Sequence, residues 1–145
     1  MAKDMRLWIN QLEAAGVLAR IEKPVDPRTQ MGALLWQARD RALFFENLTG
    51  FPGWRCLGQA PGDIHMAPLA FGCRRNEMVP EFVRRLEKLG TTRLVKTGPV
   101  KEKIMIGDQV DITKMPIHQG GVRDAGPYIT SGLMIEKTLT QGLGT

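Results

Sequence analysis

The chain has few of the residues that build metal sites or disulfide frameworks. Of its 145 residues only two are cysteines, and they do not form a Cys-x-x-Cys pair, so neither a disulfide framework nor a cysteine zinc site is expected. Cys56 and Cys73 are interpreted as small buried hydrophobic side chains. The two histidines, His65 and His118, have no cysteine or carboxylate at metal-ligand spacing. The sequence therefore predicts no complete metal site and no metal-binding residue.

Aromatic residues and long apolar runs are also scarce. With 6% aromatic residues the chain lacks the stacking platform of single-strand nucleic-acid binders. The net charge of +5 could attract an anionic partner, but the basic residues are spread along the chain beside acidic ones. No apolar run approaches the roughly 20 residues that cross a bilayer, and the N-terminus lacks the apolar core of a signal peptide. We therefore expect a cytoplasmic protein with no nucleic-acid and no membrane partner.

Common catalytic motifs are missing as well. There is no GxGxxG, GxxxxGK[ST] or GxSxG, so Gly-rich phosphate loops and a nucleophile elbow are not expected. The carboxylates nearest the Gly-rich loops are Asp111, Asp124 and Glu136, but spacing alone gives none of them an acid/base partner. Asp124 is expected to orient its turn through an Asx-type hydrogen bond.

The composition, 43% hydrophobic and 24% charged, is typical of a globular protein. Spacing predicts a helix over residues 5–15, capped by Asp4 and ended by Gly16, and then a strand over 17–21. A second helix should begin at Pro27, with Asp26 as its N-cap, and reach about residue 39. Residues 42–47 and 54–59 read as two strands joined by a turn.

Two further helices and a stretch of β-structure complete the pattern. The helices are expected over 64–71, capped by Asp63, and over 77–89, capped by Asn76. The second should bury its apolar residues, which are Val79, Phe82, Val83, Leu86 and Leu89. Residues 100–106 and 110–112 alternate in a way that resembles β-structure. We therefore expect residues 1–110 to form an α+β domain of about four helices around a small sheet, and residues 111–145 to begin a second domain.

Two Gly- and Pro-containing loops, residues 115–121 and 124–127, precede an apolar stretch over 128–135 that reads as a buried strand. Such loops are consistent with a structural turn, and also with the rim of a pocket. His118 lies in the first loop and is either a functional residue or part of the loop structure. His65, on the predicted 64–71 helix, is interpreted as a surface or partly buried histidine.

Four segments resemble the UbiD-type decarboxylase family. Residues 4–21, DMRLWINQLEAAGVLARI, are similar to its opening DLRxFLxxLExxGELxRI, and residues 24–27 match its PVDP connector. Residues 42–52, ALFFENLTGFP, are similar to ALLFENxxGxxxP, and residues 124–130, DAGPYIT, to DGGPYIT. Each motif alone is weak, but four in this order and spacing are specific, and together they cover nearly all of the chain.

The resemblance implies an N-terminal α+β domain leading into a split β-barrel that binds prenylated FMN. It also implies reversible decarboxylation of aromatic, heteroaromatic or other α,β-unsaturated carboxylic acids, with the flavin as an electron sink. Manganese and potassium hold the flavin phosphate in this family, an Arg and two Glu handle proton transfer, and members are commonly homo-oligomers. Tyr128, Ile129 and Thr130 are the cofactor-binding candidates, and strand alternation would place Ile129 on the face opposite the other two.

The sequence departs from the family pattern after residue 135. Residues 136–145, EKTLTQGLGT, do not match the Asn-containing segment that ligates metal and flavin, and no residue matches the catalytic Arg or acids. No catalytic or metal-binding residue is therefore carried over. We interpret the chain as a truncated UbiD-type carboxy-lyase that is inactive and binds no cofactor alone. The alternative is a non-catalytic subunit docking on a longer catalytic partner, and a third interpretation is an unrelated basic binding domain. Nothing identifies the acid.

Overall fold

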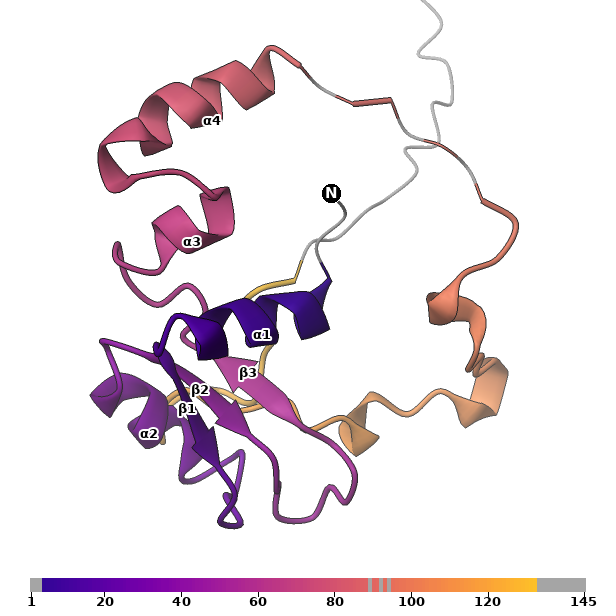
Figure 1. Ribbon diagram of the computed structural model, residues 1–145. Helices are drawn as coiled ribbons and strands as arrows, with labels where there is room; N and C mark the ends of the chain where they lie inside the picture. Colours follow the sequence, from indigo (N-terminus) through magenta and orange to yellow (C-terminus); the bar gives the residue numbers. More distant parts are fainter. Residues whose placement is uncertain (1–3, 89, 92, 94, 133–145) are drawn as a thin grey trace, which may run out of the picture.

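The computed structural model describes residues 4–88, 90, 91, 93 and 95–132. Its centre is a three-stranded sheet in the order β1-β2-β3, built from β1 (Leu18–Ile21), β2 (Ala42–Phe45) and β3 (Cys56–Gly58). β1 pairs parallel to β2, with Leu18 opposite Ala42, while β3 pairs antiparallel to β2. The predicted α+β class is confirmed (Figure 1).

The first helix forms as the sequence predicts. α1 (Met5–Ala14) begins where the Asp4 carboxylate accepts the Leu7 N–H at 2.9 Å. It ends before Gly16, whose φ of 70° is a left-handed conformation that glycine adopts without a steric penalty. Arg20 of β1 then reaches back to the Glu13 carboxylate at 2.8 Å and also to Glu46 at 2.7 Å. These ion pairs are partly exposed and add little stability.

Both faces of the central strand are buried. Leu43 and Phe45 face a cluster with Met31 of α2 (Met31–Gln37), while Ala42 faces a second cluster with Leu12 of α1. All four residues of β2 are buried. Because alternate side chains point to opposite faces of a strand, β2 supplies both clusters. The helices α1 and α2 thus cover the sheet from opposite sides (Figure 1).

Two helices begin later than predicted, because the expected caps close turns ahead of them. The Asp26 carboxylate accepts the N–H groups of Arg28 and Thr29, and α2 starts only at Met31. Likewise Asp63 accepts the N–H of His65 at 2.8 Å, and α3 (Ala67–Phe71) follows with Pro68 in its first turn, where proline is tolerated. His65 itself is exposed, as one of the sequence interpretations has it.

The prediction for the fourth helix is wrong in its cap and in its buried face. α4 (Met78–Leu86) follows a 3₁₀ turn, Arg75–Glu77, in which Glu77 rather than Asn76 bonds the backbone, accepting the Arg74 N–H at 3.0 Å. Its apolar residues are exposed instead of inward, because among the described elements α4 packs on α3 and the turn before it, away from the sheet. These residues are Val79, Phe82, Val83 and Leu86. Leu89 lies outside the described residues.

The β-structure predicted after residue 100 is also absent from the described part of the chain. Short 3₁₀ turns occupy Pro99–Lys101, Gly107–Gln109 and Ile112–Lys114. The Asp111 carboxylate accepts a hydrogen bond from the Thr113 N–H at 2.9 Å, so this backbone group is bonded by a nearby side chain instead of by a neighbouring strand. The strand predicted from Tyr128 is not formed as far as Gly132, and its remaining residues lie outside the described part. A backbone without a neighbouring strand satisfies its polar groups in turns.

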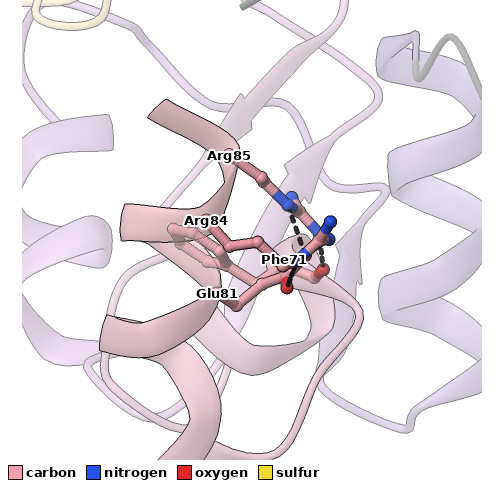
Figure 2. Close-up of polar contacts among 4 residues, drawn as sticks. All are labelled: Phe71, Glu81, Arg84 and Arg85. Atoms are coloured by element: carbon pink, nitrogen blue, oxygen red, sulfur yellow. Dashed lines mark hydrogen bonds and ion pairs between the residues drawn. The ribbon is translucent and has the colours of Figure 1, made fainter. Parts of the chain in front are cut away.

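A cluster of charged residues joins α3 to α4. Phe71 is the last residue of α3, and its carbonyl accepts a hydrogen bond from Arg85 at 2.6 Å (Figure 2). Arg85 also donates to the Glu81 carboxylate at 2.6 Å. Arg84 binds the same carboxylate through two hydrogen bonds of 2.7 Å. The Arg85 guanidinium also lies 5.5 Å from the centre of the Phe71 ring, which meets Phe82 edge-on. Arg85 thus caps α3 while Glu81 holds it in place.

The carboxyl group of Glu81 should titrate far below its usual range. Hydrogen bonds from Arg84, and then from Arg85, lower its pKa to about 2. Because the pKa of Glu81 is lowered in the folded chain, the ionised carboxylate stabilises the fold fully above pH 4.5, the ordinary pKa of a glutamate. This stabilisation is lost as the pH falls through about 2. Carboxyl ¹³C NMR should therefore give a midpoint near 2. The Arg84→Gln/Arg85→Gln double variant should return it toward 4.5, and Arg41→Gln, which breaks a distant ion pair, should not. A midpoint near 4.5 in the unaltered chain would contradict this arrangement.

No helix among the described residues is long and apolar enough to cross a membrane.

Candidate functional site

A pocket of about 880 Å³ lies where the end of the described chain returns to the first half of the chain. One wall is α2, with Gly32, Leu35 and Trp36, and a second is β3 with the turn that follows it, residues 56–61. The third wall is formed by residues 117–122 and 128–131, and we call the whole of 117–131 the return segment. The volume lies within the range of small-molecule sites.

The return segment is attached to α2 by backbone contacts. The Gln119 N–H donates to the Pro27 carbonyl at 3.1 Å. Five residues after Pro27, in the first turn of α2, Gly32 faces Gly120 so closely that a Cβ on Gly32 would lie 2.2 Å from the Gly120 carbonyl oxygen. Such an approach is open only to a residue without a side chain. Residues more than eighty positions apart are thereby brought to one rim of the pocket.

Local hydrogen bonds shape the return segment itself. Asp124 accepts the Gly121 N–H at 2.7 Å, and the Gln119 amide donates to the Gly121 and Asp124 carbonyls at 3.0 and 3.2 Å. Asp124 therefore orients its turn, as predicted, although its donor precedes it in the chain instead of following it as in an Asx turn. The Tyr128 N–H then donates to the His118 carbonyl at 3.3 Å, and the two rings lie tilted with centres 6.4 Å apart.

The wall opposite is held by a residue that sequence reasoning missed. Gln59 has a φ of 54°, which is uncommon for a residue with a side chain, and its amide donates to the Leu35 carbonyl at 2.7 Å. This bond ties the end of β3 to α2. The only sequence signal nearby was the Pro61-Gly62 break that follows.

Cys56 on the same wall is half-buried, and burial raises the pKa of its thiol. Cys73, which does not line the pocket, is half-buried as well, so neither cysteine is as buried as expected. A raised pKa keeps Cys56 in the thiol form at neutral pH, which does not favour nucleophilic chemistry.

All three cofactor-binding candidates lie on the pocket wall. Tyr128, Ile129 and Thr130 line it together with Ser131 of the return segment. Because these residues do not form a strand, alternation does not divide them between two faces, contrary to the expectation from the sequence. Tyr128 is 51% exposed. Their cofactor-binding role remains a prediction.

The pocket offers the donors that an aromatic ligand needs, but the described residues do not offer a metal site. Hydroxyl groups of Thr130 and Ser131, the imidazole of His118 and the rings of Trp36 and Tyr128 line the same space. Apolar walls with a few convergent polar groups are typical of small-molecule sites. In the described part of the chain no three His, Cys, Asp or Glu side chains lie close enough together to hold a metal ion. The described lining of the pocket therefore has the character of a small-molecule site.

Comparison with known families identifies the chain. Residues 9–86 match the 3-octaprenyl-4-hydroxybenzoate carboxy-lyase N-terminal domain, and residues 93–144 match the Rift-related domain of the same carboxy-lyase. The chain belongs to the UbiD family. This confirms the resemblance and excludes the unrelated basic domain among the three interpretations.

Solved structures of UbiD-class enzymes show the same fold. One is an evolved dimeric form of HmfF from Pelotomaculum thermopropionicum in complex with prenylated FMN (prFMN). Its sequence is 34% identical, the TM-score is 0.77, and the match covers 86% of this chain and 29% of HmfF. Vanillic acid decarboxylase from Sedimentibacter hydroxybenzoicus is 25% identical with a TM-score of 0.77, covering 89% and 30%. The fold is shared by apo 3,4-dihydroxybenzoic acid decarboxylase from Klebsiella pneumoniae, which is 23% identical with a TM-score of 0.77. That match covers 87% of this chain and 29% of the decarboxylase. The UbiD-family chain thus spans under a third of the length of these structures.

Proposed function

We propose that residues 1–145 form the scaffold and one wall of the flavin site in a prenylated-FMN-dependent carboxy-lyase. The substrate class is an aromatic or other α,β-unsaturated carboxylic acid. In this proposal residues 1–110 are the N-terminal domain and residues 111–145 begin the flavin-binding split-barrel domain. The single observation that carries it is the pocket whose wall contains Tyr128, Ile129 and Thr130, in a chain of this family.

The role of these residues follows from their chemistry. When bound, the flavin supplies the electron sink for loss of CO₂. In this proposal the hydroxyl groups of Thr130 and Ser131, two residues of the pocket lining, would donate hydrogen bonds to the flavin, and Ile129 would add an apolar contact. The half-exposed Tyr128 ring offers a stacking surface. Arg and Glu residues for proton transfer, together with manganese and potassium, would be supplied by other parts of the enzyme, which we expect to work in the cytoplasm.

Flavin retention tests the proposal. A polypeptide that contains residues 1–145 and the rest of a UbiD enzyme, purified with prenylated FMN, should bind one flavin and release CO₂ from some members of a panel of benzoates, heteroaromatic acids and acrylic acids. Thr130→Val should weaken flavin retention by about 2- to 10-fold, the value of one hydrogen bond. Thr113→Val, which lies outside the pocket lining, is the matched control.

Residues 1–145 expressed alone should behave differently. We expect no decarboxylation and no stoichiometric flavin, because no residue of this sequence matches the family's metal-binding segment or its catalytic Arg and acids. An absorbance scan after reconstitution with prenylated FMN gives the answer. Stoichiometric flavin on this polypeptide alone would contradict the proposed division of the site.

An assembly subunit remains the second candidate, and the exposed apolar face of α4 favours it. Val79 is 74% exposed and Phe82 50%, which is unusual for large apolar side chains on one side of a helix. A subunit docking on a longer catalytic partner would cover this face. Stable co-purification with such a partner encoded by a separate gene supports the subunit, whereas continuation of the same gene into the missing segments supports the enzyme. Homo-oligomers are expected of the complete enzyme.

A further inference from the structure

We propose that Gly32 is the positioning residue of this pocket. Because it lacks a side chain, α2 and the return segment meet backbone to backbone, and this contact holds the wall that carries Tyr128, Ile129 and Thr130. The inference concerns the shape of the pocket and is independent of the ligand that occupies it.

The contact leaves no room for the smallest side chain. A Cβ on Gly32 would lie 2.2 Å from the Gly120 oxygen, 2.9 Å from the Gly120 carbonyl carbon and 2.9 Å from the Gln119 oxygen. All three are backbone atoms, so no rotamer change relieves the overlap. The return segment must move away from α2, and because Gly32 sits inside a helix that is anchored by the fully buried Met31, the segment is the part that yields.

Helix propensity would predict the opposite outcome. Alanine is a better helix former than glycine, so Gly32→Ala should strengthen α2 if Gly32 had no partner. The tertiary contact accounts for the poorer helix former in the first turn of this seven-residue helix. Loss of the attachment of the return segment to α2 after this substitution would carry the signature of the contact.

The backbone hydrogen bonds of the return segment separate a local effect from a global one. The Gln119 N–H bonds to Pro27 at the base of α2, so it depends on docking. The Gly121 N–H bonds to Asp124 within the segment, so it does not. The Glu46 N–H bonds to Ile21 across the sheet and reports on the fold as a whole.

Amide hydrogen exchange by NMR on residues 1–145, without flavin, tests the proposal. In Gly32→Ala the Gln119 amide should exchange about tenfold faster or more, while the amides of Gly121 and Glu46 change by less than about twofold. The matched control is Gly126→Ala, in the same segment, where an added Cβ meets nothing within 4 Å. The Gly126→Ala substitution should leave the exchange rate of the Gln119 amide unchanged.

Three results would overturn the inference. The first is an unchanged exchange rate of the Gln119 amide in a folded Gly32→Ala chain. The second is an equal increase in the exchange rates of the Gln119 and Glu46 amides, and the third is failure of the Gly32→Ala chain to fold. The last two would make the contact a general support of the domain instead of a local one. Because no flavin is present, these outcomes are separate from those of the Thr130→Val test of the proposed function.

Discussion

Replacing Phe45 by alanine should lower the free energy of unfolding by about 3–5 kcal/mol. Phe45 lies on β2 and is fully buried in the cluster with Val25, Met31 and Leu48. Removing the ring takes away its transfer free energy and leaves a cavity between the sheet and α2. Urea denaturation followed by circular dichroism measures the effect, which is a large part of the roughly 5–15 kcal/mol that stabilises an ordinary domain.

Phe82→Ala is the matched control, because the same atoms are removed from a half-exposed site on α4. Its described aromatic contact is the edge-on approach to Phe71, at 6.4 Å between ring centres, so we expect a cost of about 0.5–1.5 kcal/mol. An equal loss in the free energy of unfolding for Phe45→Ala and Phe82→Ala would show that α4 is covered in solution or that β2 is not the centre of the core.

Replacing Leu12 by alanine should cost about 2–5 kcal/mol. Leu12 is the one buried residue of α1, and it packs with Ala42 of the sheet and with Met66, just before α3. The loss should therefore be felt in two places, at the docking of α1 and at the attachment of α3. Hydrogen exchange should show faster exchange at the Val17 amide, which bonds to the Leu12 carbonyl, and at the Ala70 amide, which bonds to Met66.

Leu7→Ala on the same helix is the control for Leu12→Ala. Leu7 is 41% exposed, so its truncation should change stability by no more than about 0.5–1 kcal/mol. A Leu7 variant as unstable as the Leu12 variant would mean that α1 presents a different face to the sheet.

Local sequence signals predicted the first half of the fold well. Asp4 and Gly16 set the ends of α1 through contacts within one turn, and the short apolar run that begins at residue 42 predicted a strand. Caps were less reliable at Asp26 and Asp63, since a carboxylate that accepts two neighbouring N–H groups stabilises a turn as readily as a helix.

Periodicity failed where burial depends on distant segments. The spacing on α4 predicts an apolar face, and that face exists, but spacing cannot say whether anything lies against it. Likewise the alternation in residues 100–106 favours a strand, yet a strand needs a neighbour for its hydrogen bonds. In the described chain that stretch forms no strand and runs from one 3₁₀ turn, Pro99–Lys101, to another, Gly107–Gln109.

The candidate site divides in the same way. Gly and Pro punctuation and the DAGPYIT motif indicated the return segment, and the family could be read from four short motifs in order. Nothing in one sequence connected Gly32 to Gly120, or Gln59 to Leu35, because these contacts join residues that no local rule relates.

By itself, then, the sequence determined the family, the α+β class, the ends of α1 and the existence of a strand at residues 42–45, since each depends on contacts within a few residues or on a family pattern. Only the tertiary structure decided that Tyr128, Ile129 and Thr130 share one pocket with α2. The physical reason is a backbone approach that two glycines permit and that chain topology alone brings about.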